Sequence, residues 1–282
     1  MNMPLDSTFH AIAASLFHPG MGTEHIGPLL HAVACMHRPR TILVVGAGYS
    51  TVFLLQALAD IEQERARDEA ILAGRIDDPA RRELLLPDAA GADRDHEPAR
   101  LIVIDDFSDD RGRLRHLDRC IEQLGLAPLV VVHRQRYQEW QAPTRFRADL
   151  VWLDCGHQLD YSDLCNRFWP LVSEEGGLLA MHYTYVDIQP LADEPPVLIP
   201  GPWINAAKSQ HARLGPRATF ELLSLVEPHK RRQGSVSWLR KSPADACRSS
   251  TLEHEQRALY GRCGPALDEL HRGRAGSQER RP

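Results

Sequence analysis

Five short apolar runs constrain the fold of this chain more than any other feature of its sequence. Each has the length of a single strand, and segments with helical spacing of apolar residues lie between most of them, for example residues 111–126 and 159–175. The runs are residues 41–45, 101–105, 129–133, 149–154 and 176–182. Strands rich in Val, Ile and Leu that alternate with helices are typical of a parallel sheet covered on both faces. We therefore predict an α/β fold.

The pattern changes after residue 216. Residues 218–226 and 234–240 are predicted to be two strands in succession, with a basic loop and no helix between them. Two strands joined in this way pair antiparallel. We predict that they form a C-terminal hairpin on the parallel sheet, which then has seven strands.

Two regions depart from the alternation of strands and helices. Residues 60–100 are rich in Asp, Glu, Arg and Ala, and they make the first crossover longer than a helix and a loop require. We interpret them as a solvated, charged insertion that adds little to the core. Residues 242–282 are polar with weak helical spacing, and we predict a partly disordered tail. The folded domain is then residues 1–241.

Composition and charge exclude several classes of protein. With 282 residues, 43% of them hydrophobic, the chain can bury one full core. Its formal charge of −5 gives no basic field for nucleic acid, and its apolar runs are too short to span a membrane. The N-terminus has no basic segment followed by an apolar one, so we expect no secretory leader and a cytoplasmic protein. Its six cysteines form no CxxC pair, which favours reduced thiols over disulfides or zinc.

A glycine turn follows the first strand. Gly46 and Gly48 let the backbone turn tightly and approach a ligand, and apolar residues with helical spacing follow directly. Asp105 ends the second apolar run, where an acid can accept the hydroxyls of a ribose. A glycine turn and such an acid indicate an adenosine-containing ligand. Pyrophosphate fits poorly, because Thr51 stands where a dinucleotide site has its third glycine and no GK[ST] follows.

Three segments and the order of the elements carry a resemblance to a known family. The segments are VVGAGYST at residues 44–51, LIVIDD at 101–106, and 148–185, which begins ADLVWLDCGH and ends LLAMHYTY. With the final hairpin, they resemble the class I S-adenosylmethionine-dependent methyltransferases, and among these the small-molecule O-methyltransferases of the catechol and macrocin types. Residues 18–40 are similar to the helices that cap the first strand in those enzymes. The resemblance implies a Rossmann-like, doubly wound sheet and S-adenosylmethionine as the cofactor.

The resemblance also implies a set of cofactor-binding residues. They are Gly46, Gly48, Tyr49, Ser50, Asp105, Asp106, Gln135 and Asp154. Two positions depart from the family pattern. Val44 stands where an acid usually helps to hold the methionine amino group, and Gln135 stands where an acid commonly contacts the adenine edge. Glutamine can still hydrogen-bond an adenine amine, whereas the change at Val44 leaves cofactor capture to other groups.

Candidate catalytic groups follow the fourth and fifth apolar runs. His157 and His182 are our candidates for the base that removes a proton from the substrate, with Asp154 to orient the cofactor or the base. Tyr183 and Trp203 are candidates for the substrate wall. Related enzymes hold magnesium with carboxylates at these strand ends, but a His-Tyr pair replaces the second carboxylate here, so we predict no metal. A mixed nitrogen and oxygen site of Asp154, His157 and His182 for a transition metal stays open.

From these observations we predict methyl transfer from S-adenosylmethionine to an oxygen or nitrogen of a small metabolite. One alternative is a protein of this fold that binds the cofactor without transferring methyl, pericyclase-like or regulatory, which Val44 keeps open. A nicotinamide-dependent oxidoreductase is disfavoured by Thr51 and the final hairpin. A nucleic-acid methyltransferase is disfavoured by the acidic balance and by DCGH where an (N/D)PP(Y/F) motif is expected. The partner is then a small molecule, without nucleic acid or membrane, and the chain could form a homodimer.

Overall fold

Seven strands form one mixed sheet in a computed structural model of the chain. The structure describes residues 5–74, 99–108, 111–155, 160–188, 197–215, 218–227, 230 and 234–242. The strands are β1 (Thr41–Val45), β2 (Arg100–Ile104), β3 (Val130–His133), β4 (Leu150–Leu153), β5 (Leu178–His182), β8 (Phe220–Val226) and β9 (Ser235–Lys241). Their order across the sheet is β3-β2-β1-β4-β5-β9-β8.

The first five strands run parallel. From β1 the chain first adds β2 and β3 on one side and then adds β4 and β5 on the other side, so the strand order reverses between β1 and β4. β1 pairs with β2 on one side and with β4 on the other, both in parallel. All five carboxyl ends therefore lie along one edge of the sheet. In open parallel sheets a ligand binds outside this edge, where the strand order reverses.

The final hairpin is present as predicted, and its second strand is the inner one. β9 pairs antiparallel with both β5 and β8, so β8 lies at the edge of the sheet. The burial pattern explains this order. Six of the seven residues of β9 are buried, as suits an inner strand, whereas exposed residues alternate along β8.

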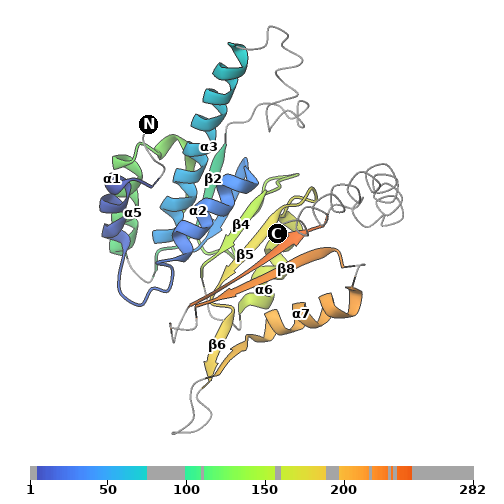
Figure 1. Cartoon of the computed structure of the whole chain (residues 1–282). Helices are drawn as coiled ribbons and strands as arrows, with labels where there is room; N and C mark the ends of the chain where they lie inside the picture. Colours follow the sequence, from blue (N-terminus) through green and yellow to red (C-terminus); the bar gives the residue numbers. More distant parts are fainter. Residues whose placement is uncertain are drawn as a thin grey trace, which may run out of the picture.

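Helices cover both faces of the sheet and enclose two clusters of buried side chains (Figure 1). The first cluster lies under α1 (Ser7–Ala13), α2 (Ile26–His37), α3 (Tyr49–Ala73) and α5 (Arg111–Gln123). The second lies under α6 (Tyr161–Phe168) and α7 (Pro202–Leu214). Three-residue 3₁₀ turns occur at Ala14–Leu16, Ala127–Leu129 and Trp169–Leu171.

Helix α3 is 25 residues long and continues into the predicted insertion. Its apolar positions from Val52 to Ile61 are buried against the sheet, as the sequence indicates. Beyond Ile61, no described side chain of α3 is buried, and Figure 1 shows this end of the helix standing clear of the sheet. The first part of the 60–100 insertion is therefore a solvated extension of α3. Residues 75–98 and the predicted tail from 243 onward lie outside the described residues.

A second, two-stranded sheet lies between β5 and α7, where the sequence analysis predicted no strand. β6 (Tyr185–Ile188) pairs antiparallel with β7 (Val197–Pro200), and α7 follows at once. Figure 1 shows β6 extending away from the main sheet. Each strand has only four residues, too few to show an alternation of apolar and polar residues.

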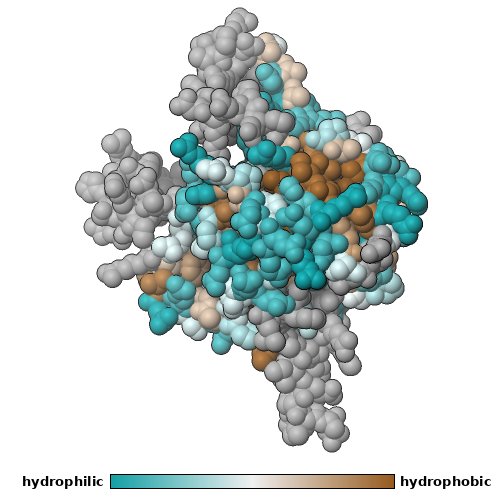
Figure 2. Space-filling model, turned by 180° about the vertical axis from the view of Figure 1, so that it is seen from behind, coloured by the Kyte–Doolittle hydropathy of each residue, from teal (hydrophilic) through white to brown (hydrophobic). Residues whose placement is uncertain are grey.

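Among the described residues, no helix is both long and apolar enough to cross a bilayer. Figure 2 shows a largely hydrophilic face, with its most extensive apolar area at the upper right. The four described cysteines, Cys35, Cys120, Cys155 and Cys165, are free thiols.

Candidate active site at the carboxyl edge of the sheet

A cavity of about 490 Å³ lies along the carboxyl ends of β1 to β5. This volume falls within the range of roughly 300–1,000 Å³ that is typical of small-molecule sites. Its lining comprises Val45, Gly46, Ile104, Asp105, Asp106, Ser108, Arg113, Gln135, Arg136, Tyr137, Gln138, Asp154, Cys155, Tyr161, His182 and Tyr183. Seven residues that the sequence assigned to the site therefore meet in one cavity.

The order of the strands sets the order of groups along this cavity. Gln135 follows β3, Asp105 follows β2, Gly46 follows β1, Asp154 follows β4, and His182 ends β5. Neighbouring strands lie about 4.8 Å apart, so the four spacings from β3 to β5 separate the two ends by roughly 19 Å. The cavity is thus elongated, with the predicted adenine contact at one end and the predicted base at the other.

The two glycines of the turn are needed for different reasons. Gly46 has φ +93°, and a Cβ there would lie 2.3 Å from the Asp154 carbonyl oxygen and 2.9 Å from Cys155 Cβ. Glycine is therefore required at Gly46 because the end of β4 packs directly against the turn. At Gly48 a Cβ would meet no protein atom within 4 Å. The Gly48 N–H donates to Thr51 Oγ1 at 3.0 Å, which closes the turn onto the first helical residues.

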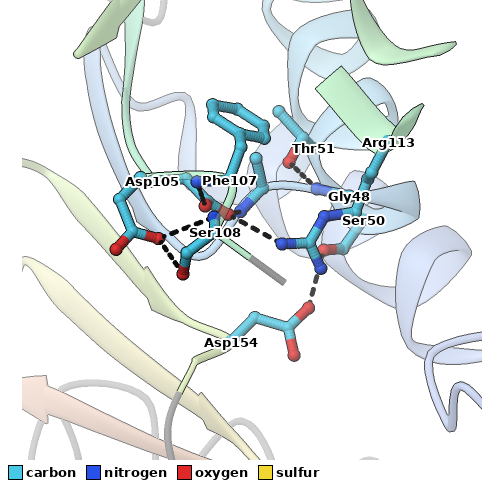
Figure 3. A network of polar contacts seen from close by, with 10 residues as sticks. Gly48, Ser50, Thr51, Asp105, Phe107, Ser108, Arg113 and Asp154 are labelled. Carbon is cyan, nitrogen blue, oxygen red and sulfur yellow. Dashed lines mark hydrogen bonds and ion pairs between the residues drawn. The ribbon is translucent and has the colours of Figure 1, made fainter. Parts of the chain in front are cut away.

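Asp105 joins the glycine turn to the end of β2. Its carboxylate accepts hydrogen bonds from the Ala47 N–H at 2.7 Å and from the Phe107 N–H at 2.6 Å. The Arg113 guanidinium lies 3.4 Å from the same carboxylate, and Figure 3 shows these contacts. The side chain is only 8% exposed, yet it lines the cavity. Asp105 thus has a structural role that the sequence did not reveal, beside the predicted contact to a ribose.

Asp106 is the more accessible acid of the pair. Its side chain is 32% exposed and lies 3.5 Å from Arg136 Nε. The Ser108 hydroxyl and backbone N–H both donate to it, and these hydrogen bonds hold the pKa of the Asp106 carboxyl below its usual value. It is therefore ionised at neutral pH and presents acceptors at the rim of the cavity.

Asp154 and His182 form an oriented acid–imidazole pair. Asp154 Oδ1 lies 2.7 Å from His182 Nδ1. The other oxygen, Oδ2, accepts from the Ser50 hydroxyl at 3.1 Å, and Ser50 in turn accepts from Trp152 Nε1 at 3.0 Å (Figure 3 shows the Ser50–Asp154 contact). A carboxylate that accepts the Nδ1 proton fixes the tautomer of the ring, so the lone pair is on Nε2. The Trp152 ring stacks on the imidazole, with centroids 6.1 Å apart.

This chain of contacts changes the role expected of Ser50. The sequence assigned Ser50 to cofactor binding, but its side chain is 1% exposed and does not line the cavity. Its hydroxyl is already engaged with Asp154 and Trp152. Ser50 therefore holds the Asp154 carboxylate in position without itself lining the cavity. The sequence could not show this, because the three residues are brought together from β4 and α3.

The backbone of His182 and of the residue that follows it is also constrained. The Tyr161 hydroxyl donates to the His182 carbonyl oxygen, and burial raises the pKa of Tyr161. The next residue, Tyr183, has φ +54°, and Phe107 beside Asp105 has φ +51°. Non-glycine residues in this left-handed region are uncommon and often occur at functional sites. Tyr183 directly follows β5, and Phe107 lies three residues after the end of β2; both strands border the cavity.

Two other titratable side chains of the cavity are poor candidates for a base. Burial, together with the neighbouring Asp154 carboxylate, raises the pKa of the Cys155 thiol to about 12. Burial and the Asp163 carboxylate likewise raise the pKa of Tyr137 to about 12. Both groups are protonated at neutral pH. The imidazole of His182 is better suited to accept a proton there.

The described lining of the cavity does not include Gly48, Tyr49 or Trp203. Tyr49 packs against Phe53 of α3, with ring centroids 4.8 Å apart, and neither Tyr49 nor Gly48 contributes to the lining. Trp203 lies in the first turn of α7 and packs against the second core cluster. Val44 is fully buried in the first cluster, so its side chain does not face the cavity. His157 lies in residues 156–159, outside the described residues.

Several solved structures are similar to this one across most of the chain. The O-methyltransferase TomG from Streptomyces achromogenes, in complex with S-adenosylmethionine, is 18% identical, with a TM-score of 0.49 over 84% of this chain and 91% of that one. A candidate O-methyltransferase from Klebsiella pneumoniae is 10% identical, with a TM-score of 0.50 over 85% and 92%. An O-methyltransferase from Bacillus cereus, in complex with S-adenosylhomocysteine, is 13% identical, with a TM-score of 0.48 over 85% and 93%. No protein-family model and no curated protein matches the chain.

The likeness to the Klebsiella protein, together with the strand order, decides the fold. This chain has the class I methyltransferase fold. At such low identity the likeness concerns the fold alone. Within the class I methyltransferase fold, the cavity described above lies where the strand order reverses between β1 and β4.

Sequence reasoning missed four charged or aromatic residues of the cavity lining. Arg113 and Arg136 line the cavity beside the two aspartates, and Tyr137 and Tyr161 line it near Cys155 and His182. Arg136 and Tyr137 directly follow Gln135 after β3, so their position was a usable signal. Tyr161 and Arg113 lie in the first turns of helices, where nothing local distinguishes them from other helical residues. Only the packing of these helices brings their side chains to the cavity.

Proposed function

We propose that this protein transfers the methyl group of S-adenosylmethionine to an oxygen or nitrogen of a small metabolite. The observation that carries the proposal is the pairing, in one elongated cavity, of acceptors suited to a nucleoside with an oriented Asp–His pair. The volume of about 490 Å³ favours a small acceptor over a macromolecule. The acidic balance of the chain favours the same substrate class.

The residues present are suited to hold this cofactor. Asp105 and Asp106 offer carboxylate oxygens for ribose hydroxyls, and Gln135 offers an amide for the adenine edge. Gly46 brings backbone atoms to the wall between them and Asp154. When bound, S-adenosylmethionine supplies a methyl group activated by its positively charged sulfur. Val44 stands where the family usually has an acid for the methionine amino group. Asp154, which lines the cavity toward the end opposite Gln135, is the acid that we propose for this contact.

The chain's own contribution to the reaction is to place and remove a proton. His182 accepts the proton of a hydroxyl or ammonium substrate, and Asp154 holds the ring and stabilises the positive charge that forms on it. The side chain of His182 is only 6% exposed, so the pair operates with little competing water. Tyr183 borders the same part of the cavity and is our candidate for the substrate wall.

Calorimetry on the full chain with S-adenosylmethionine, S-adenosylhomocysteine and NAD in parallel tests the proposal. We expect both adenosyl ligands to bind and NAD to give no heat of binding. Incubation with S-adenosylmethionine and a panel of phenols, carboxylates and amines should then release S-adenosylhomocysteine with some acceptors. Preferential binding of NAD would contradict the proposal. Tight adenosyl binding without turnover for any acceptor would favour the alternative of a non-transferring cofactor binder.

Asp105 variants test the cofactor assignment more specifically. We expect Asp105→Ala to weaken binding of S-adenosylhomocysteine by about 1.5–3 kcal/mol, or roughly 10- to 150-fold in Kd, the range for hydrogen bonds to a charged group. Because Ala47 and Phe107 also depend on this carboxylate, Asp105→Asn should be measured beside it. The control is Asp118→Ala on α5, whose carboxylate lies 3.5 Å from Arg134. Unchanged affinity in both Asp105 variants, with unchanged melting temperatures, would show that the ribose contact lies elsewhere.

A further inference from the structure

A second group of chemically reactive side chains lies between α2 and α3. His31 and Cys35 are four residues apart on α2, so they share one face of that helix. Asp60 reaches them from α3, and the ligand atoms of the three residues lie within 4.8 Å of one another. Over the part of the chain that the structure describes, no other group of three or more His, Cys, Asp or Glu side chains meets this criterion. None of the three lines the cavity of the candidate active site.

The distances are close to those of a tetrahedral metal centre. Zinc bonds of about 2.0–2.1 Å to nitrogen, 2.0–2.2 Å to oxygen and 2.3 Å to sulfur place tetrahedral ligands roughly 3.3–3.8 Å from one another. Cys35 Sγ already lies 3.8 Å from His31 Nε2. His31 Nε2 lies 2.7 Å from Asp60 Oδ2, a hydrogen-bond distance. Binding of the ion would require this His31–Asp60 contact to open by about 0.6 Å.

The donor set selects the kind of ion. One imidazole nitrogen, one thiolate and one carboxylate suit zinc or a similar transition metal, whereas magnesium and calcium prefer oxygen ligands alone. A thiolate and a carboxylate together also neutralise the two charges of the ion. This matters because the site is largely buried, with the side chains of His31 and Asp60 only 8% and 18% exposed.

A further contact holds the carboxylate in a ligand-like orientation. Gln56, one turn before Asp60 on α3, donates from Nε2 to Asp60 Oδ1 at 2.8 Å. The other oxygen, Oδ2, is thereby directed at His31. Metal-binding carboxylates are commonly fixed in this way by a second hydrogen bond. Cys35 is partly exposed, so the fourth position of a tetrahedral ion can be filled by water.

We propose that His31, Cys35 and Asp60 bind Zn²⁺ and that the ion joins α2 to α3. No sequence pattern indicated such a site, since the cysteines form no CxxC pair and the third ligand follows Cys35 by 25 residues. Packing of α2 on α3 brings the donors together. The proposal is independent of the methyl-transfer reaction, because it concerns a different place in the fold.

Cobalt substitution tests the site on the full chain, reduced and treated with a chelator that is then removed. Titration with Co²⁺ should give a saturable thiolate-to-cobalt charge-transfer band together with the visible bands of tetrahedral cobalt, complete at one equivalent. Addition of zinc should displace the cobalt and abolish both the charge-transfer band and the visible bands. Zinc at a hundredfold excess over its Kd should also raise the melting temperature by about 5–10 °C.

Matched variants identify the ligands. Cys35→Ser should remove the charge-transfer band, and His31→Gln should abolish saturable binding. Gln56→Leu removes only the supporting hydrogen bond and should weaken cobalt binding roughly 10- to 100-fold. Cys165→Ala removes a buried thiol elsewhere and should leave the spectrum unchanged. The proposal is overturned if the parent chain gives no saturable band, or if the band persists unaltered in both Cys35→Ser and His31→Gln.

Discussion

Replacing His182 with alanine is expected to lower the methylation rate by about 10²–10⁴-fold, the usual cost of losing a general base. The variant removes the imidazole that Asp154 orients at 2.7 Å, while the acceptors after β2 and β3 remain in place. Binding of S-adenosylhomocysteine should therefore stay close to that of the parent. The rate is measured as release of S-adenosylhomocysteine with an acceptor found in the substrate screen. The matched control is His116→Ala, which removes an exposed histidine from α5.

Variants of Asp154 test whether Asp154 and His182 act together. Asp154→Asn should also slow the reaction, because an amide can favour the wrong tautomer of the ring. At saturating S-adenosylmethionine the double variant should be no slower than His182→Ala alone, since the two side chains act as one unit in proton removal. A rate that is lost on chelation and restored by a divalent metal in Cys35→Ser, which lacks a ligand of the proposed zinc site, would instead make His182 a metal ligand or its neighbour. Full rates in His182→Ala at neutral pH would place the base elsewhere.

Gly46→Ala is expected to destabilise the fold by about 2–5 kcal/mol. A left-handed backbone conformation costs a non-glycine residue roughly 1–2 kcal/mol, and overpacking a dense region costs roughly 1–3 kcal/mol more. Both apply, because φ is +93° and the new Cβ would lie 2.3 Å from a carbonyl oxygen at the end of β4. The melting temperature should fall by about 5–20 °C. Affinity for S-adenosylhomocysteine should fall with it, since the turn and the end of β4 border the same cavity.

Gly48→Ala is the control for this prediction. It adds the same methyl group two residues later, where no protein atom lies within 4 Å, and should keep the parent melting temperature. A drop in affinity for S-adenosylhomocysteine without a drop in stability would then indicate that the ligand itself occupies the space beside Gly48. Equal melting temperatures for the parent and Gly46→Ala would refute the packing argument.

The sequence by itself determined the architecture and the edge at which the site lies. Each apolar run became a strand within one or two residues, because a parallel strand covered on both faces has to be apolar on both. Crossovers between parallel strands return the chain to the same end of the sheet. Gly46, Asp105, Asp154 and His182 could therefore be predicted at one edge, although they are far apart along the chain.

Only the tertiary structure decided which partner each side chain contacts. The Ser50 hydroxyl donates to Asp154, which lies 104 residues further along the chain. The Asp105 carboxylate accepts from the Ala47 N–H, 58 residues earlier. The order of β9 and β8 at the edge of the sheet, and the meeting of His31 with Asp60, arose in the same way. Local periodicity specifies which face of an element is buried. It does not specify which polar groups of other elements meet that face, because their positions depend on how helices and strands pack across the whole domain.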